Sequence, residues 1–399
     1  MLLLKYNRED NLSQEKPKKF NKKPQGFDFD GSFEELIRGI QEFENSTPAH
    51  QIFSTGSLFL DSYFNPLDPG IPAGQFIMLY GEGSTGKTSF CLNMIRQHTI
   101  VEGGITLFID AEGGLMPTLT KLYGICKYTT PNFLYSSTTW LDDALDKAVQ
   151  AMTYWMNKDP NRKVLIVIDG IGTAPPKPQT KEATEKGGSQ YGTVGDDGRV
   201  GTVARILTNF AKYHAVCQKT NCLVVMNNQP TTQIMGPQSG QPYFGGGNKI
   251  KVVCDMILHM TSNFVCLDND DKNAHKREYK DDNGTIWKTP KTLRIIKNKN
   301  SSPKPDVDYS LIMLPKYGYC GFDDREMCAQ YLFSRGKIRS GAWYHVAGSK
   351  WQGYQNFYEA LQTNPDVWYE VQVMTINELR AHYTQALSEM ENNKESKDE

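Results

Sequence analysis

A glycine-rich segment in the first quarter of the chain carries residue types that bind phosphate. It matches the pattern G-x-x-x-x-G-K-[ST], and its residues, with the serine that follows, are Gly81, Glu82, Gly83, Ser84, Thr85, Gly86, Lys87, Thr88 and Ser89. Glycines let the backbone curl so that successive N–H groups point at phosphate oxygens. Lys87 supplies a mobile cation, and the Thr88 hydroxyl is a suitable ligand for Mg²⁺. This segment predicts a site for a nucleoside triphosphate.

The flanking sequence predicts the elements that position such a loop. An apolar run at residues 75–80 predicts a strand, and a helical pattern begins near Ser89. A helix in that place directs the positive end of its dipole toward bound phosphate. A glycine-rich turn that matched the pattern by chance would lack this order of strand, loop and helix.

Polar residues follow three further apolar runs, where an open α/β sheet binds its ligands. Asp169 closes one run and is placed to support Mg²⁺ through water, although a plain strand-end cap has the same position. Glu112 follows another run and is placed to orient the water that attacks the γ-phosphate, or is an ordinary surface glutamate. Gln229 follows a third, where an amide either senses the γ-phosphate or forms a turn.

The chain divides into three sections. Residues 1–50 form a polar arm with an amphipathic helix predicted near residues 33–43, and residues 316–399 read as a small C-terminal domain with an acidic tail. Between them, residues 51–315 alternate apolar runs with helical patterns. Strands are predicted at residues 75–80, 105–110, 164–169, 223–227 and 256–260. Near-continuous apolar strands joined by helices predict an α/β fold with a mostly parallel sheet covered by helices.

Composition sets few limits on partners. The net charge of -1 neither requires nor excludes nucleic acid, so any DNA contact must come from local basic groups. The eight cysteines form no C-x-x-C pair and no secretory segment opens the chain, which predicts reduced thiols and a cytoplasmic protein. No apolar run approaches the length needed to cross a bilayer, so no membrane partner is expected.

Two long segments interrupt the central section, at about residues 174–199 and 230–247. Loops of this length inside a compact domain are usually functional or disordered. Aromatic and basic residues in or near them could stack on bases and bind phosphates, namely Arg199, Arg205, Lys212, Tyr243, Phe244 and Lys249. The alternative is a pair of mobile linkers whose aromatic residues cover the domain surface.

An ordered series of motifs resembles one known family. The matching segments are residues 54–61, 70–75, the phosphate loop, 108–112, 246–249, 296–299 and 341–344, which together reach across most of residues 51–380. The chain resembles the RecA-type recombinases of bacteria and large phages. A phosphate loop alone is shared by many unrelated proteins, whereas this ordered series is far more specific.

The resemblance implies a RecA-like P-loop NTPase core that binds ATP and Mg²⁺. It assigns phosphate and metal binding to Lys87, Thr88 and Asp169, and the catalytic position to Glu112. It implies that Gln229 links the γ-phosphate to the second DNA-binding loop. Two lysines, Lys297 and Lys299, match residues that reach the neighbouring subunit's nucleotide, although alternating lysines more often mark an exposed face of an edge strand. Arg205 and Lys212 match residues that contact the single-stranded backbone.

The resemblance also implies a function. The expected protein is a DNA-dependent ATPase that forms a filament on single-stranded DNA and exchanges strands with a homologous duplex, in a bacterial or phage-infected cytoplasm. Its expected partners are both DNAs, further copies of itself through the arm at residues 1–50, a single-stranded DNA-binding protein and a recombination mediator. Two alternatives stay open, a ring-forming helicase that uses an arginine finger and a nucleotide-gated assembly protein that does not use DNA.

Two positions depart from the family around the adenine. The family has Asp and Tyr where this chain has Met116 and Leu119. The base is therefore expected to stack on Leu119 or Tyr123. The start of the second loop, residues 230–233, lacks the family's basic residues, which shifts phosphate contact toward Lys249 and Arg205.

Overall fold

The computed structural model describes residues 51–126, 130–177, 202–232, 242–244, 248–261, 279–280, 286–301, 306–314 and 319–398. Residues 48–399 form one compact unit, which holds all the elements below. The predicted N-terminal arm at residues 1–50, with its helix near residues 33–43, lies outside the described residues.

A ten-stranded sheet forms the centre of this unit: nine strands follow the order β14-β13-β12-β10-β3-β7-β6-β4-β5, and β11 lies off this path and pairs with β12. The strands from β10 to β5 run parallel: β10 (Met256–Thr261), β3 (Gln75–Tyr80), β7 (Cys222–Asn228), β6 (Val164–Asp169), β4 (Ile105–Asp110) and β5 (Phe133–Ser137). Antiparallel strands extend the sheet beyond β10: β11 (Tyr279–Lys280), β12 (Ile286–Asn298), β13 (Val307–Leu314) and β14 (Tyr319–Phe322). The predicted α/β fold with a mostly parallel sheet is confirmed.

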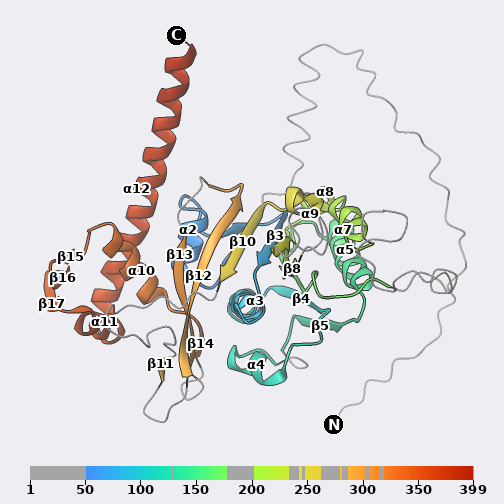
Figure 1. Cartoon of the computed structure of the whole chain (residues 1–399), viewed down its shortest axis with the longest axis horizontal. Helices are drawn as coiled ribbons and strands as arrows, with labels where there is room; N and C mark the ends of the chain where they lie inside the picture. The colour runs from blue at the N-terminus through green and yellow to red at the C-terminus, as the bar shows by residue number, and fades with distance from the viewer. Residues whose placement is uncertain are drawn as a thin grey trace, which may run out of the picture. The chain divides into compact units, whose positions relative to one another are not determined.

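Helices cover both faces of the parallel strands (Figure 1). One face packs on α5 (Leu141–Lys158), α7 (Thr202–Ala211), α8 (His214–Cys217) and α9 (Asn248–Val253). The other packs on α3 (Lys87–Ile95), which continues as the π-helix η1 (Arg96–Val101), and lies near α4 (Pro117–Leu122). Alternate residues of β3 supply the two cores: Phe76 and Met78 join one cluster, and Ile77 and Leu79 the other. This burial on both sides explains the continuous apolar runs in the sequence.

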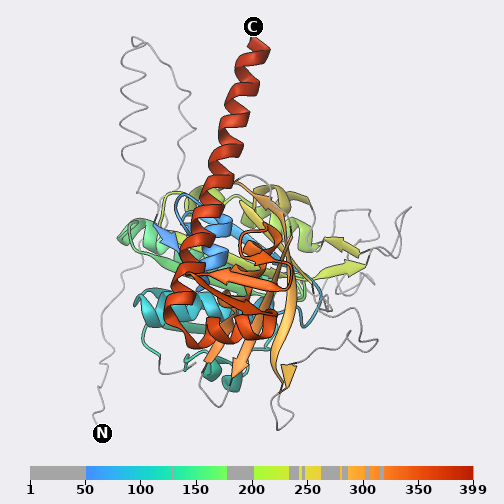
Figure 2. The same ribbon diagram turned by 90° about the vertical axis from the view of Figure 1, so that its left-hand side faces the viewer.

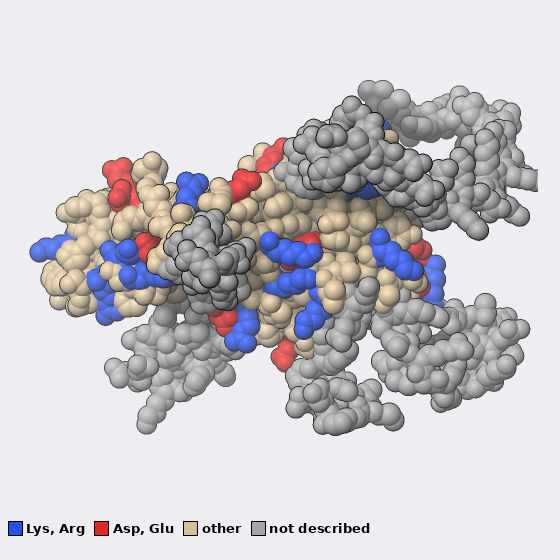
Figure 3. Space-filling model, turned by 90° about the horizontal axis from the view of Figure 1, so that it is seen from above, with Lys and Arg blue, Asp and Glu red and all other residues tan. Residues whose placement is uncertain are grey.

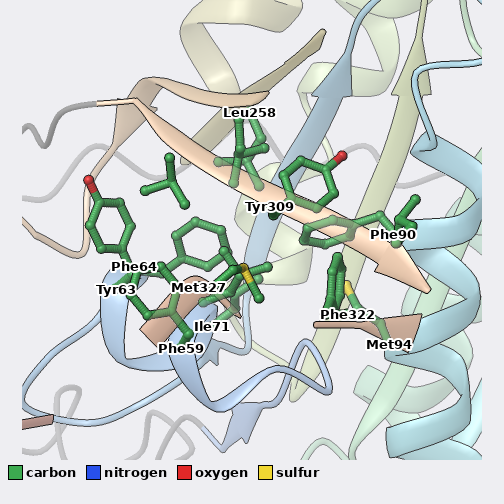
Figure 4. Packing of buried hydrophobic residues seen from close by; sticks show 14 of the residues in the cluster. Phe59, Tyr63, Phe64, Ile71, Phe90, Met94, Leu258, Tyr309, Phe322 and Met327 are labelled. Carbon is green, nitrogen blue, oxygen red and sulfur yellow. The ribbon is translucent and has the colours of Figure 1, made fainter. Parts of the chain in front are cut away.

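The C-terminal section shares its core with the rest of the unit. It contains α10 (Asp324–Ser334), α11 (Tyr354–Thr363), α12 (Pro365–Asp398) and the antiparallel strands β15 (Arg339–Ser340), β16 (Trp343–Val346) and β17 (Ser349–Gln352). Figure 4 shows Met327 of α10 among Phe59 and Phe64 of α2 (Leu58–Phe64), and all three belong to one hydrophobic cluster. Helix α12 also contacts α2 and α10 (Figure 2). The predicted domain boundary near residue 315 stays a prediction.

Two short pairs of strands complete the described elements. Strand β1 (Ile52–Phe53) pairs with β2 (Ile71–Pro72), ahead of the phosphate loop. Strand β8 (Pro230–Thr232) pairs with β9 (Pro242–Phe244), at the position of the second predicted DNA loop.

Two enclosed carboxyl groups lie near α2: Asp61 ties this helix to the segment before it, and Asp324 ties its start to α10. Asp61 accepts hydrogen bonds from the Ser54 hydroxyl (2.5 Å) and from the backbone and side chain of Thr55 (both 2.7 Å). Asp324 accepts hydrogen bonds from the Ser57 hydroxyl and from the backbone N–H of Leu58 (2.9 Å). Burial raises the pKa of each carboxyl to about 6, despite these donors.

The raised pKa values predict that acid stabilises this part of the fold. An unfolded Asp has a pKa near 3.9, so the folded state binds protons more tightly. The stabilisation is fully present below that value and is lost as the pH rises through 6, by up to ~3 kcal/mol for each carboxyl. The urea midpoint should be higher at pH 5.0 than at pH 7.5, and Asp324→Asn should reduce the difference. Asp366→Asn, at an exposed position of α12, is the control. An unchanged difference in Asp324→Asn would contradict the prediction.

Candidate nucleotide and DNA site

The phosphate loop joins β3 to α3 as predicted. Helix α3 begins at Lys87, two positions before the predicted start at Ser89, so Lys87 and Thr88 lie in its first turn. Gly86 has the left-handed φ of 93°, and a Cβ there would lie 2.8 Å from Leu311 Cδ1, which explains the need for glycine. The loop therefore presents the backbone N–H groups of a helix N-terminus to a phosphate.

Lys87 lies folded over its own loop. Its ammonium group donates hydrogen bonds to the carbonyl oxygens of Gly81 (2.8 Å) and Glu82 (2.7 Å). Burial lowers the pKa of Lys87, and the nearby carboxylates of Asp169 and Glu112 oppose that shift. The Lys87 ammonium therefore lies where the loop would bind phosphate. The negative charge of the phosphate would stabilise the charged form of Lys87 further.

The residues predicted to hold Mg²⁺ meet at the end of β6. The Thr88 hydroxyl donates a hydrogen bond to Asp169 Oδ2 at 2.7 Å, and Asp169 is buried. Burial raises the pKa of Asp169, while the Thr88 hydrogen bond opposes the rise. Within the described ranges, no cluster of three or more His, Cys, Asp or Glu side chains could hold a metal. One carboxylate and one hydroxyl suit Mg²⁺, which takes its other ligands from phosphate and water.

Glu112 lies directly after β4, beside the predicted γ-phosphate sensor. Its Oε1 accepts hydrogen bonds from Gln229 Nε2 (3.1 Å) and from the Thr173 hydroxyl (2.6 Å). The preceding Asp110 holds the turn in place, because its carboxylate accepts the backbone N–H of Gly113 (2.7 Å) and the Tyr135 hydroxyl (2.9 Å). The structure thus brings Glu112 and Gln229 together. Thr173 was not predicted, because a threonine in a turn is too common to signal a site.

Lys291 is a second contact that sequence reasoning missed. It lies on β12, more than two hundred residues from the loop, and donates a hydrogen bond to the carbonyl oxygen of Ser84 at 3.0 Å. Burial lowers the pKa of Lys291. Ser84 has a left-handed φ of 62°, so Lys291 braces the loop where its backbone is unusual for a non-glycine residue.

Lys291→Met should therefore loosen the phosphate loop. We expect the KM for ATP to rise about 3- to 10-fold, the range for losing one hydrogen bond of ordinary strength, with a smaller change in kcat. Steady-state ATPase kinetics measure both. Arg294→Met is the matched control, since Arg294 is exposed on the same strand and pairs with Asp306 instead of the loop. Equal kinetics for the two variants would exclude this role of Lys291.

Lys297 and Lys299 lie at and just after the end of β12, two strands away from β3, and Lys297 is level with Ile257 of β10 and so with Met78 of β3. Lys297 Nζ donates to the carbonyl oxygen of Val252 at the end of α9 (2.6 Å), and Lys299 Nζ pairs with Asp255 (2.6 Å). Asp255 also accepts the backbone N–H of Phe76, the second residue of β3, at 2.9 Å. Phe76 is five residue steps before Gly81 at the start of the loop, or about 16 Å along the strand, whereas Met78, level with Lys297, is three steps before it, or about 10 Å. The two lysines are therefore remote from their own protomer's loop.

The DNA-binding predictions fall only partly within the described residues. Arg199 lies outside them, and so does most of the second loop. Arg205 lies on α7, and Tyr243, Phe244 and Lys249 on β9 and α9, but their side chains are outside the description. Lys212 is exposed just after α7, and its Nζ lies 3.1 Å from Asn209 Oδ1. Pairing of Thr231 with Tyr243 closes the base of the second loop. These DNA contacts stay predictions.

The residues expected around the adenine differ in exposure. Met116, which precedes α4, is 60% exposed, and Leu119 is half-buried against the core. Tyr123 is 1% exposed and belongs to that core, so it cannot stack on a base without leaving it. Of the two residues expected to stack, only Leu119 is partly exposed, and its contact with a base stays a prediction.

The described surface carries charges of both signs. On the face in Figure 3, basic and acidic side chains are interspersed among uncharged residues. This pattern accords with the near-zero net charge and makes local contacts more important than a general attraction for DNA. No helix in the described parts of the chain is long and apolar enough to span a membrane.

Comparison with known proteins gives consistent matches over this core. The model of the RecA N-terminal domain matches residues 39–314. Protein RecA of Streptococcus thermophilus is 27% identical over 337 residues, which cover 84% of this chain and 78% of that protein. Protein RecA of Acinetobacter baylyi is 26% identical over 339 residues, which cover 84% and 85%. A family match of this extent, over a sheet that carries the phosphate loop and strand-end carboxylate just described, makes the chain a member of the RecA family.

Proposed function

We propose that this protein is an ATP-dependent recombinase that forms a filament on single-stranded DNA and catalyses homologous pairing and strand exchange. Its family membership and its RecA relatives support this function. The observation that carries the proposal is the hydrogen bond from Gln229 to Glu112. Gln229 immediately precedes the second predicted DNA loop, so the residue at the entry of that loop touches the carboxylate expected to activate water.

The residues of the site divide the work of ATP hydrolysis. Loop N–H groups and Lys87 bind the phosphates, while Thr88 and Asp169 would hold Mg²⁺, which supplies charge neutralisation. Glu112 orients a water molecule and accepts its proton. The Gln229 amide can donate to Glu112, as here, or to a phosphate oxygen. That choice would link the nucleotide state to the second loop.

The filament places a nucleotide between protomers. Lys297 and Lys299 of one protomer would contact the nucleotide of the next, in keeping with their distance from their own phosphate loop. The stability of the filament then depends on the γ-phosphate, and hydrolysis loosens it. Further partners in this function are a homologous duplex, a single-stranded DNA-binding protein and a mediator, in the cytoplasm of a bacterium or of a phage-infected host.

The first test is the ATPase rate with and without single-stranded DNA, beside strand exchange with a homologous and a heterologous duplex. The proposal predicts stimulation by DNA and exchange only with the homologous duplex. Stimulation without exchange would favour a helicase or translocase. No stimulation would favour an assembly protein that does not use DNA.

A further inference from the structure

We propose that Thr173 is a positioning residue that restrains Glu112 in the DNA-free protomer and so links the first predicted DNA loop to ATP hydrolysis. The inference rests on the proposed function, because it adds a second control to the same site. In this arrangement each DNA loop has its own hydrogen bond to the same carboxylate.

The two hydrogen bonds converge on one atom. Glu112 Oε1 accepts the Thr173 hydroxyl at 2.6 Å and the Gln229 amide at 3.1 Å. Thr173 immediately precedes the first predicted loop at residues 174–199, and Gln229 immediately precedes the second at residues 230–247. A carbonyl oxygen, that of Gly170, is also near the Thr173 hydroxyl, but at 3.4 Å. The hydroxyl has one proton, and it donates this proton to the nearer acceptor, the Glu112 carboxylate.

Two glycines allow this close approach. A Cβ on Gly170 would lie 2.4 Å from Glu112 Oε1 and 3.2 Å from the Thr173 hydroxyl oxygen. A Cβ on Gly172 would lie 2.4 Å from Asn228 Oδ1 and 3.1 Å from the backbone nitrogen of Gln229. The turn after β6 therefore lies directly against both Glu112 and the start of the second loop. A shift of either loop entry must change the contacts of Glu112.

The chain leaving Thr173 is anchored on both sides. The backbone N–H of Ala174 donates to the Gly170 carbonyl at 3.3 Å, and the carbonyl of Pro175 accepts the backbone N–H of Leu141 at 2.9 Å. Ala174 is also buried. Thr173 is itself exposed, so its hydroxyl can leave Glu112 without opening the core. The hydrogen bond from Thr173 to Glu112 therefore persists while residues 173–175 keep this conformation, and it can break when they shift.

The restraint acts on the lone pairs and the direction of the Glu112 carboxylate. An oxygen that already accepts two hydrogen bonds has fewer lone pairs to direct at an attacking water. DNA bound at the first loop would draw Thr173 away and free one lone pair for the attacking water. Hydrolysis would then be slow without DNA and faster with it.

The test compares Thr173→Val, which removes the hydroxyl at nearly constant shape, with Thr173→Ser, which keeps it. In Thr173→Val we expect the DNA-independent kcat to rise about 3- to 10-fold, the range for one hydrogen bond. At saturating DNA, the kcat of Thr173→Val should stay within about twofold of the wild-type value, since DNA already breaks the hydrogen bond from Thr173 to Glu112. Thr173→Ser should behave as the wild type.

Thr363→Val is the matched control, since that hydroxyl donates to the carbonyl of Glu359 within α11 and lies outside the site. The inference is overturned if Thr173→Val lowers both rates together, or if it leaves both rates unchanged. A wild-type enzyme that DNA does not stimulate would instead refute the proposed function. The basal kcat of Thr173→Val, compared with that of Thr173→Ser, would then decide alone whether Thr173 restrains Glu112.

Discussion

Glu112→Gln should lose nearly all ATP hydrolysis and still bind ATP. Glutamine has the shape of glutamate, and its side-chain oxygen can still accept the hydrogen bond from Thr173, but it cannot accept a proton from water. Loss of a general base typically costs 10²- to 10⁴-fold, so we expect kcat to fall by at least about 100-fold. ATPase assays measure the rate, and a fluorescent nucleotide measures the affinity, which should change by less than about threefold.

The same variant should form longer-lived filaments with ATP, because hydrolysis is the step that loosens them. Electron microscopy and DNA dissociation rates both report this lifetime. Glu359→Gln, at an exposed position of α11, controls for the loss of one negative charge. A Glu112→Gln enzyme that kept a third or more of the wild-type rate would show that another group accepts the proton.

Changing both Lys297 and Lys299 to Ala should reduce DNA-stimulated hydrolysis by about 100-fold, the usual scale for removing preorganised charge from a transition state. ATP binding to isolated protomers should change little, because the lysines lie at the end of β12, two strands away from the β3 strand that leads into their own phosphate loop. The variant removes the Lys299 partner of the buried Asp255, which keeps His214 (2.7 Å) and the backbone N–H of Phe76. Thermal unfolding therefore needs to be measured beside the rate, to separate lost stability from lost catalysis.

A mixing experiment gives the sharper result. The Lys297/Lys299 variant keeps its phosphate loop, and a Lys87→Ala variant keeps both lysines. In an equal mixture about a quarter of the head-to-tail interfaces combine an intact loop with intact lysines. Mixed filaments should therefore regain up to about a quarter of the wild-type rate, although each variant alone is inactive. A mixture with no activity would show that the lysines do not act across the subunit boundary.

The strand positions and the phosphate loop were predictable because they depend on local order. Residues 164–169 form a strand that is buried along its whole length, and this appears in the sequence as an unbroken apolar run that ends in Asp169. The phosphate loop is readable for a similar reason. Its glycines and lysine must follow one another within a few residues, so the motif is complete in a single stretch.

The contacts between distant segments were decided only by the tertiary structure. Thr173 reaches Glu112 because β6 lies between β4 and β7, and Lys291 reaches Ser84 because antiparallel strands extend the sheet beyond β10. Lys299 finds Asp255 for the same reason. The order and direction of the strands depend on how the whole chain packs around its two cores, and a local sequence pattern does not specify that order. The sequence by itself therefore determined the phosphate chemistry and the elements that position it, while the folded sheet decided which residues control that chemistry.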